Sequence, residues 1–242
     1  MPAGPDQPTV VVVVAGGDPP DPRCRMWLPI GAPVVAADSG ADHAMALGLA
    51  VDELVGDLDS VSAAARQAVE DHGGSIRPFP ADKDWTDLEL ALGVAAERHP
   101  DLIVVVGGHG GRVDHHLAGL LLLGAPRFAS TTITAWHGPA LLTVVRPGPP
   151  AALHGPVGSL VSLVPLGAGP RSVTTTGLRY PLRGEPLFAG TTRGVSNGIA
   201  APGASVAIGD GVLLAIQPDR LDDLDSPRTD GSAVDLDPEE RP

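Results

Sequence analysis

The chain has 242 residues, 43% of them hydrophobic but only 3% aromatic, so it can bury a sizeable core built mainly from valine, leucine, alanine and isoleucine. Its formal charge of −13 argues against binding to nucleic acid, which requires a basic surface. A single cysteine, Cys24, excludes a framework of internal disulfides and a cysteine-based zinc site.

The N-terminal stretch MPAGPDQPT lacks the basic region and the long apolar run of a secretory signal. The run TVVVVVAGG that follows is too short to span a bilayer. Together with the single cysteine, these features predict a cytoplasmic protein that does not associate with membranes.

The first half of the chain alternates apolar runs with helical patterns. The runs that read as strands cover residues 9–16, 33–38, 52–57, 75–80, 102–108 and 131–136. The segments with helical periodicity end near Gly or Pro and cover residues 40–49, 62–73, 86–99 and 113–124. This alternation with short joints predicts an α/β fold, with a mostly parallel sheet and helices on both of its faces.

Near residue 138 the pattern changes to short β-like runs between Gly and Pro turns, at 140–145, 159–166, 172–178 and 205–218. We therefore expect an α/β domain over 1–137, followed by a smaller C-terminal all-β sandwich domain over 138–217. From Asp219 onward the chain has nine acidic and three basic residues. This composition predicts that the acidic tail, 218–242, is disordered.

In an open parallel sheet, ligands bind at the carboxyl ends of the strands, in the loops that lead to the next helices. The polar and glycine-rich stretches of the first half all fall in such loops. They comprise Gly16 and Gly17, Asp38, the pair Asp57 and Asp59, the stretch DKDWTD (82–87) and the stretch GGHGGRVD (107–114). Five loops that meet at one edge favour a single functional site there.

Asp57 and Asp59 flank one leucine directly after a predicted strand. Two carboxylates at such a short distance repel each other. The arrangement is therefore favourable if a cation binds between them. Mg²⁺ is usually held by one or two carboxylates together with substrate phosphates, and Asp87 arrives from the next loop. We therefore predict a magnesium site of these three aspartates. The alternative is that Asp59 or Ser60 caps the helix that begins near Ser62.

The glycine loop GGHGGRVDHH (107–116) is typical of a turn whose backbone N–H groups bind an anion, although it is neither a Walker A loop nor a G-x-G-x-x-G motif. Arg112 adds a fork of donors that suits phosphate oxygens. Asp114 holds either Arg112 or a substrate group, or is a favourable anion in the first helical turn. Adjacent histidines point to different faces of a helix, so we favour no metal role for His109, His115 and His116.

Two further stretches have a structural as well as a functional interpretation. In DWTD (84–87), Asp84 could cap a helix, with Asp87 in a position like that of a capping box. Ser196 and Asn197 could hydrogen-bond a polar heterocycle, but a Ser-Asn pair beside glycines is also a common turn. From composition alone the turn is favoured.

Taken in order, these motifs resemble the thiamine pyrophosphokinase (thiamine diphosphokinase) family. The stretches that carry the resemblance are ADSGAD, VGDLDS, DKDWTDLELAL, GGHGGRVDHHLAGL and TTGLRYPL followed by GVSNGI, and it extends from about residue 10 to residue 217. The family implies an α/β catalytic domain, a C-terminal β-sandwich and a homodimer with active sites at its interface. The implied reaction is Mg²⁺-dependent transfer of pyrophosphate from ATP to the hydroxyethyl oxygen of thiamine, which releases AMP.

The resemblance also implies roles for individual residues. Around magnesium would lie Asp57, Asp59 and Asp87, with Asp38 beside them. The nucleotide phosphates would be contacted by Lys83 and Thr86. The glycine loop would complete the catalytic pocket with Gly108, Gly110, Gly111, Arg112 and Asp114. The pyrimidine of thiamine would be held by Ser196 and Asn197, with an aromatic face from Tyr180. Which aspartate accepts the proton of the alcohol stays open.

Three other functions compete with this one. The same acidic motif could serve another Mg²⁺- and nucleotide-dependent transferase that acts on a different acceptor. The chain could also be a non-catalytic nucleotide- or thiamine-binding protein, although such a protein would normally have lost its acidic motifs. Finally, it could be an α/β interaction protein whose loop carboxylates are helix caps, and the convergence of five loops weighs against that.

Overall fold

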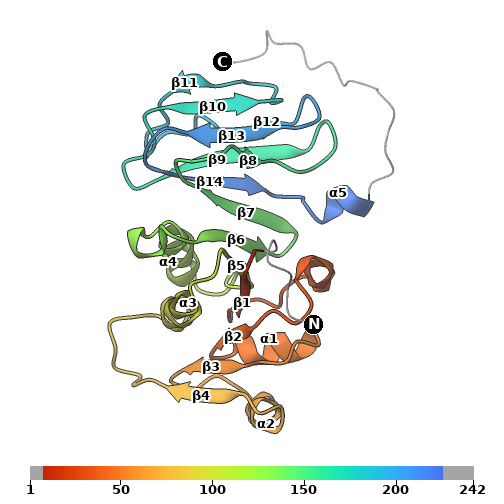
Figure 1. Cartoon of the computed structure of the whole chain (residues 1–242), viewed down its shortest axis with the longest axis vertical. Coiled ribbons are helices and arrows are strands. Elements are labelled where there is room, and N and C mark those ends of the chain that lie inside the picture. The colour runs from red at the N-terminus through yellow and green to blue at the C-terminus, as the bar shows by residue number, and fades with distance from the viewer. Residues whose placement is uncertain (1–7, 226–242) are drawn as a thin grey trace.

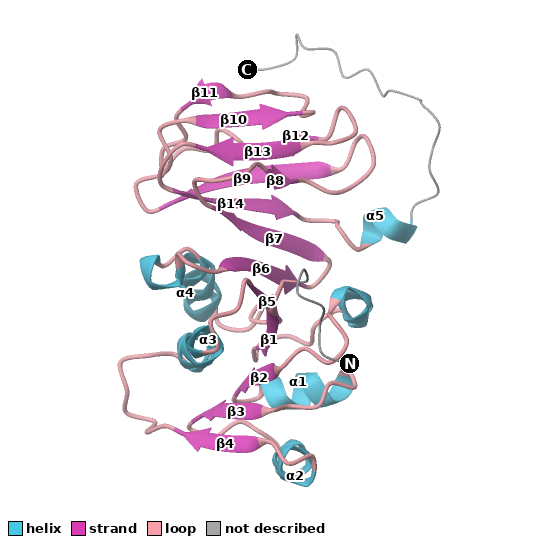
Figure 2. Ribbon diagram, in the orientation of Figure 1, coloured by secondary structure: helices cyan, strands magenta, loops and turns pink. Residues whose placement is uncertain are grey.

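The computed structural model describes residues 8–225, which fold around two β-sheets (Figures 1 and 2). The strands of the first half are β1 (Val10–Val14), β2 (Val34–Ala37), β3 (Glu53–Gly56), β4 (Ser75–Pro78), β5 (Leu102–Val106) and β6 (Thr132–His137). They pair in parallel in the order β4-β3-β2-β1-β5-β6. The predicted mostly parallel sheet is therefore confirmed.

Helices cover both faces of this sheet, as predicted. The α-helices are α1 (Gly40–Ala46), α2 (Ala63–Asp71), α3 (Asp87–Glu97) and α4 (Val113–Leu123), and the short 3-10 helices are η1 (Pro22–Trp27) and η2 (Pro126–Phe128). In Figure 1, α3 and α4 lie on one side of the sheet and α1 lies on the other. Every predicted helix has a counterpart, whereas sequence patterns did not indicate η1.

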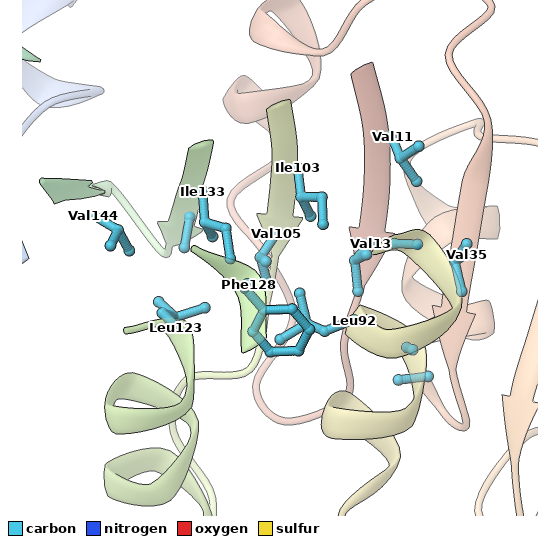
Figure 3. Packing of buried hydrophobic residues seen from close by; sticks show 14 of the residues in the cluster. Val11, Val13, Val35, Leu92, Ile103, Val105, Leu123, Phe128, Ile133 and Val144 are labelled. Carbon is cyan, nitrogen blue, oxygen red and sulfur yellow. The ribbon is translucent and has the colours of Figure 1, made fainter. Parts of the chain in front are cut away.

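The alternation of side chains along each strand divides the core of this half in two. Val11 and Val13 of β1 pack into a cluster with residues of α3 and α4, and Figure 3 shows Phe128 of η2 beside Leu92 of α3 within it. Val12 and Val14 point to the opposite face and join a cluster with residues of α1, α2 and η1. Burying one such valine or leucine side chain contributes about 1.5–3 kcal/mol. The valine runs therefore suit a sheet that is covered on both faces.

The second half continues the large sheet and adds a small one. Its strands are β7 (Ala140–Val145), β8 (Ala151–Ala152), β9 (Leu160–Leu166), β10 (Val173–Thr176), β11 (Arg183–Glu185), β12 (Asn197–Gly198), β13 (Ser205–Ile208) and β14 (Val212–Gln217). β7 pairs antiparallel with β6, and β14, β9 and β12 follow it to complete a ten-stranded sheet. The second sheet has the order β11-β10-β13-β8.

The predicted C-terminal sandwich forms between these two sheets. Its core contains Val161 and Leu163 of β9, Leu213 of β14, and Val173 and Val206 of the small sheet, all fully buried. The sandwich is not a separate body, because one of its sheets is the extension of the parallel sheet across the pairing of β6 with β7. The proposed boundary between residues 137 and 138 falls in the turn that joins these two strands.

The start of the predicted acidic tail packs against the body of the protein. Leu221 is fully buried, and its N–H donates to the carbonyl of Pro139 at 3.0 Å. Helix α5 (Asp222–Asp225) follows, and Asp222 pairs with Arg23 of η1 at 2.7 Å. Residues 219–225 thus differ from the predicted disorder, and residues 226–242 lie outside the described part of the chain. Between residues 8 and 225, no helix combines the length and hydrophobicity needed to cross a membrane.

Candidate active site

A cavity of about 610 Å³ opens at the carboxyl ends of β1, β2, β3 and β5. It is lined by the loops that follow these strands and by the start of α3 and α4. The residues that were singled out in the sequence and line it are Asp38, Asp57, Asp59, Thr86, Asp87, Gly108, Gly110, Gly111 and Arg112. The structure therefore brings most of the sequence-predicted residues of the first half to one place.

Three aspartates form a compact group in this cavity. One carboxylate oxygen each of Asp38, Asp57 and Asp59 lies within 4.8 Å of the other two. Asp38 follows β2 with a left-handed φ of 47° and is only 7% exposed. Its Oδ2 accepts a hydrogen bond from the hydroxyl of Ser60, whereas its Oδ1 is buried without a partner in the described chain.

The three side chains of this group are all carboxyl groups, so they cannot neutralise one another. The charge of Asp57 is the main cause that raises the pKa of the Asp59 carboxyl. Burial works to raise the pKa of Asp57 itself, but the hydrogen bond from the Asp59 N–H and the nearby Lys83 outweigh it, so this pKa is lowered. A set of carboxylate oxygens that repel one another, one of them buried and unpaired, fits a hard divalent cation such as Mg²⁺.

Asp87, the third predicted magnesium ligand, instead pairs with Lys83. The ammonium Nζ of Lys83 lies 2.9 Å from Asp87 Oδ1 and 3.4 Å from Asp57 Oδ2, and the Lys83 side chain is only 9% exposed. Burial works to lower the pKa of Lys83, but the hydrogen bond and charge of Asp87 and the charge of Asp57 outweigh it, so this pKa is raised. Of the 16 Lys and Arg residues in the chain, Lys83 is the one lysine.

The start of α3 explains the local role of Thr86. Thr86 is the N-cap, and its hydroxyl accepts a hydrogen bond from the N–H of Glu89 at 3.2 Å. Asp84 therefore does not cap the helix. Asp87 is the first residue of α3, which places its carboxylate where the helix dipole favours a negative charge.

The glycine loop has a backbone that favours glycine at four positions. Gly107, Gly108, Gly110 and Gly111 have φ values of 83°, 78°, 69° and 59°. The loop lies against the one that follows β1, because the N–H of Gly108 donates to the carbonyl of Gly16 at 2.8 Å. The result is a cavity wall made largely of backbone, beside the first turn of α4.

Arg112 and Asp114 form an ion pair at the rim of this wall. Arg112 precedes α4, and its Nη2 lies 2.6 Å from Asp114 Oδ2, with both side chains exposed. The hydrogen bond from Arg112 lowers the pKa of Asp114 to about 2. Arg112 lines the cavity, whereas Asp114 does not and reaches the site only through this pair.

His109 of the glycine loop and His115 and His116 of α4 also line the cavity, and His137 lies next to them. The rings of His109 and His137 are stacked at 5.8 Å, and His116 lies 5.5 Å from His137. The Nδ1 atoms of His109 and His137 are buried and have no partner within residues 8–225. Burial lowers the pKa of His137 to about 3. His137 ends β6 and belongs to no motif, so its place here could not be predicted from a sequence pattern.

The three residues predicted to contact thiamine lie elsewhere. Ser196, Asn197 and Tyr180 do not line the cavity, and β12 is six strands away from β1 at the edge of the large sheet. The buried amide of Asn197 accepts from the N–H of Tyr180 at 2.9 Å and donates to its carbonyl at 2.7 Å. Ser196 is exposed, with a left-handed φ of 57°.

Ser60 is a site residue that sequence reasoning considered only as a helix cap. The cap of α2 is Ser62, whose hydroxyl accepts from the N–H of Ala65 at 3.1 Å. Ser60 instead lines the cavity and reaches Asp38. Its position directly after the second aspartate of VGDLDS was the available signal.

Comparison with known proteins points to one enzyme family. Residues 32–135 match the model of the thiamin pyrophosphokinase catalytic domain, and residues 153–213 match that of the thiamin pyrophosphokinase vitamin B1 binding domain. The thiamine pyrophosphokinase of Bacillus subtilis is 28% identical over 183 residues, which cover 76% of this chain and 86% of that protein.

Solved structures show the same arrangement. A crystal structure of thiamine pyrophosphokinase from Bacillus subtilis superposes with a TM-score of 0.75 at 25% identity, over 86% of this chain and 98% of that one. The enzyme from Geobacillus thermodenitrificans gives a TM-score of 0.70 at 26% identity, over 86% and 96%. The two domain models together match most of the chain, in the order that the family requires. The chain therefore belongs to the thiamine pyrophosphokinase family of enzymes.

Proposed function

We propose that the protein transfers pyrophosphate from ATP to the hydroxyl of thiamine, in a reaction that depends on Mg²⁺ and yields thiamine diphosphate and AMP. The observation that carries this proposal is the convergence of Asp38, Asp57 and Asp59 beside a glycine-rich backbone wall. Membership of the family supports the substrates, because pyrophosphate transfer from ATP is the family reaction.

The residues of the acidic group suit magnesium, which we propose is held by Asp38, Asp57 and Asp59. Support comes from the unpaired buried Oδ1 of Asp38 and from the preference of Mg²⁺ for carboxylate oxygens. Magnesium bound there would neutralise charge on the transferred phosphoryl groups. Asp87, which also lines the cavity and pairs with Lys83, stays in this proposal as a further magnesium ligand at the border of the group.

The phosphates of ATP would lie between the acidic group and the glycine loop. The backbone of Gly108, Gly110 and Gly111 can approach an anion closely, because no side chain intervenes. Arg112 offers a planar set of donors to phosphate oxygens that carry developing charge, and Asp114 orients it. Lys83 and Thr86 stand beside this path as the proposed nucleotide contacts.

The acceptor is a primary alcohol, far too weak an acid to ionise by itself. A carboxylate of the acidic group would accept its proton late in a loose transition state. Asp38, Asp57 and Asp59 all line the cavity, and which of them accepts the proton stays open.

Thiamine would be held by the second half of the chain, and we propose that the working unit is a homodimer. Within one chain, Ser196 and Tyr180 do not reach the cavity, so a second copy is needed to combine the two halves of the site. The second half of the chain exposes three large apolar side chains, Tyr180, Phe188 and Val195. We propose that they belong to the surface that meets the second copy. The hydrogen bonds of Asn197 to Tyr180 suggest that Asn197 shapes this surface.

We further propose that the protein works in the cytoplasm. Cys24 is buried and unpaired, which suits a reducing compartment, and ATP is available there.

The test is incubation of the full chain with ATP, Mg²⁺ and thiamine, with AMP and thiamine diphosphate measured together. Equal amounts of both products, abolished by EDTA, are expected. AMP that depends on a different acceptor, without the thiamine product, would indicate another transferase. Neither product, combined with measurable binding of ATP or thiamine, would indicate a non-catalytic binding protein.

A further inference from the structure

The carboxylate of Asp38 is held in an unusual way. It is almost fully buried, one of its oxygens accepts a hydrogen bond from Ser60, and the other oxygen has no partner in the described chain. A buried carboxylate oxygen without a partner is rare, since buried polar groups are normally hydrogen-bonded. Something outside the chain is therefore expected to complete its contacts.

The backbone of Asp38 is fixed on every side. Its N–H donates to the carbonyl of Val55 at 2.8 Å, and its carbonyl accepts from the N–H of Ala41 at 3.0 Å. A Cβ on Gly56 would lie only 3.1 Å from the Cβ of Asp38, so the two strand ends are in close contact. The remaining freedom of the side chain is rotation of the carboxyl group, which is broad for aspartate.

The loop after β3 brings Ser60 to this carboxyl group. Gly56 has a φ of 145° and Leu58 a left-handed φ of 65°, which an L-residue other than glycine rarely adopts. Leu58 is anchored by packing against the core cluster under α1 and α2. The loop thereby presents Asp57, Asp59 and Ser60 to the same cavity.

From this geometry we propose that Ser60 is a positioning residue for the metal site. Its hydroxyl holds Oδ2 of Asp38 and so leaves Oδ1 directed at the cation, before any nucleotide is bound. Ser60 itself does not contact the reacting atoms in this role. The inference rests on the proposed function only in that both use a cation held by Asp38, Asp57 and Asp59.

Three behaviours of Ser60 can be distinguished by measuring the cation without turnover. If Ser60 positions Asp38, removing its hydroxyl weakens metal binding to the free protein. If Ser60 only closes the loop, its removal lowers the melting temperature and leaves metal affinity unchanged. If Ser60 contacts ATP directly, Mn²⁺ affinity of the nucleotide-free protein is unchanged and only the dissociation constant of ATP, measured by calorimetry, rises.

The experiment is titration of the nucleotide-free full-length protein with Mn²⁺, with free Mn²⁺ followed by electron paramagnetic resonance. We expect Ser60→Ala to bind Mn²⁺ about tenfold more weakly, as is typical when an outer partner of a metal ligand is removed. Ser60→Thr, which keeps the hydroxyl, is expected to retain affinity. Ser62→Ala, which removes the neighbouring helix cap, is the matched control and is expected to leave Mn²⁺ affinity unchanged.

A double mutant tests whether the effect passes through Asp38. In the background of Asp38→Asn, Ser60→Ala is expected to cause no further loss of Mn²⁺ affinity, because the two residues act as one unit. Unchanged affinity in Ser60→Ala, additive losses in the double mutant, or no Mn²⁺ binding by the wild type would each overturn the proposal. Turnover of thiamine by the wild type, measured separately, shows whether the proposed function stands in any of these cases.

Discussion

The ammonium of Lys83 lies 2.9 Å from Oδ1 of Asp87 and 3.4 Å from Oδ2 of Asp57, so one lysine bridges two of the carboxylates at the site. All other positively charged side chains of the chain, histidine aside, are arginines. The ammonium of lysine is a compact charge with three donors, so it can serve two carboxylates at once. Lys83 thus acts as the internal counter-ion of the acidic group.

Replacing Lys83 with methionine is expected to lower the melting temperature in EDTA by a few degrees, because Asp57 and Asp87 lose their counter-ion. Mg²⁺ is then expected to raise the melting temperature more in Lys83→Met than in the wild type, since the cation takes over that compensation. Turnover should fall tenfold or more. Differential scanning calorimetry with EDTA and with Mg²⁺ measures both shifts, and an equal Mg²⁺ shift in the two proteins would contradict this account.

Replacing Asp59 with asparagine is expected to remove most turnover, about a hundredfold or more, while the protein stays folded. Because the charge of Asp57 raises the pKa of Asp59, neutralising Asp59 relieves repulsion, so the melting temperature in EDTA is expected to stay level or rise. Steady-state assays at saturating Mg²⁺ combined with thermal melts check both. Asp71→Asn, at the exposed end of α2, is the control and should alter neither quantity. Near-normal turnover in Asp59→Asn would remove Asp59 from the catalytic centre.

Ser196 and Asn197 are neighbours with opposite expected effects. Asn197→Ala leaves the buried N–H and carbonyl of Tyr180 without partners, so we expect a loss of about 1–3 kcal/mol in the free energy of unfolding. Ser196→Ala changes an exposed side chain and should alter stability by less than about 0.5 kcal/mol. Both variants are expected to raise the KM for thiamine and leave the KM for ATP unchanged. A rise in the KM for ATP alone would place these residues at the other substrate.

Two glycines in helices form a matched pair for stability. A Cβ on Gly40, at the start of α1, would lie 2.1 Å from the carbonyl oxygen of Val14, whereas a Cβ on Gly93, within α3, meets nothing within 4 Å. Gly40→Ala is therefore expected to destabilise the fold by about 3 kcal/mol through overpacking. Gly93→Ala is expected to stabilise it by about 1 kcal/mol, the helix preference of alanine over glycine. Urea unfolding followed by circular dichroism gives both values, and a stable Gly40→Ala variant would refute the close approach of α1 to β1.

The buried His137 gives the fold a pH dependence. Burial lowers its pKa to about 3 from the ordinary value of 6.5, so between these values the unfolded chain binds a proton that the folded protein does not. Stability from this group is therefore complete above pH 6.5 and is lost as the pH falls toward 3, by up to about 1.4 kcal/mol per pH unit. His137→Phe should flatten the slope of unfolding free energy against pH between 6.5 and 4.5.

The control for this prediction is the exposed His72, at the end of α2. His72→Gln should leave the slope as in the wild type, because this exposed side chain lies outside the cluster of His109, His116 and His137. The neighbours of His137 are His109 and His116, and burial also lowers the pKa of His109. A slope unchanged in His137→Phe would contradict the role of His137 and point to His109 instead.

Much of the fold could be predicted because its signals are local. The valine runs of β1 and β5 and the periodicity of α3 and α4 follow directly from the sequence, as does the convergence of loops at the carboxyl edge of a parallel sheet. The pairing of β6 with β7 could not be predicted in this way, since it joins two halves with different patterns into one sheet. The burial of Leu221 was also missed, because the acidic composition around it outweighs one apolar residue.

The site also contains features that the sequence predicts and features that only the three-dimensional structure shows. The spacing of Asp57 and Asp59 predicts a cation site, and the sequence pattern places Asp38 at the end of a strand. That Asp38 rather than Asp87 completes the compact group depends on the left-handed backbone of Asp38 and Leu58 and on the preference of Asp87 for Lys83. These are three-dimensional facts that no short motif contains.

The antiparallel ladder between β6 and β7, from Thr134 with Thr143 to His137 with Ala140, ties the two halves of the chain by main-chain hydrogen bonds. A hinge between the halves would have to break this ladder, so large-scale swinging of one half over the other is not available for enclosing a ligand. Closure over a ligand would therefore fall to the short loops that line the cavity, around residues 57–60, 81–88 and 108–112. Trp85 is exposed beside the second of these loops, and in a background with Trp27 and Trp136 replaced by phenylalanine its fluorescence would report such closure.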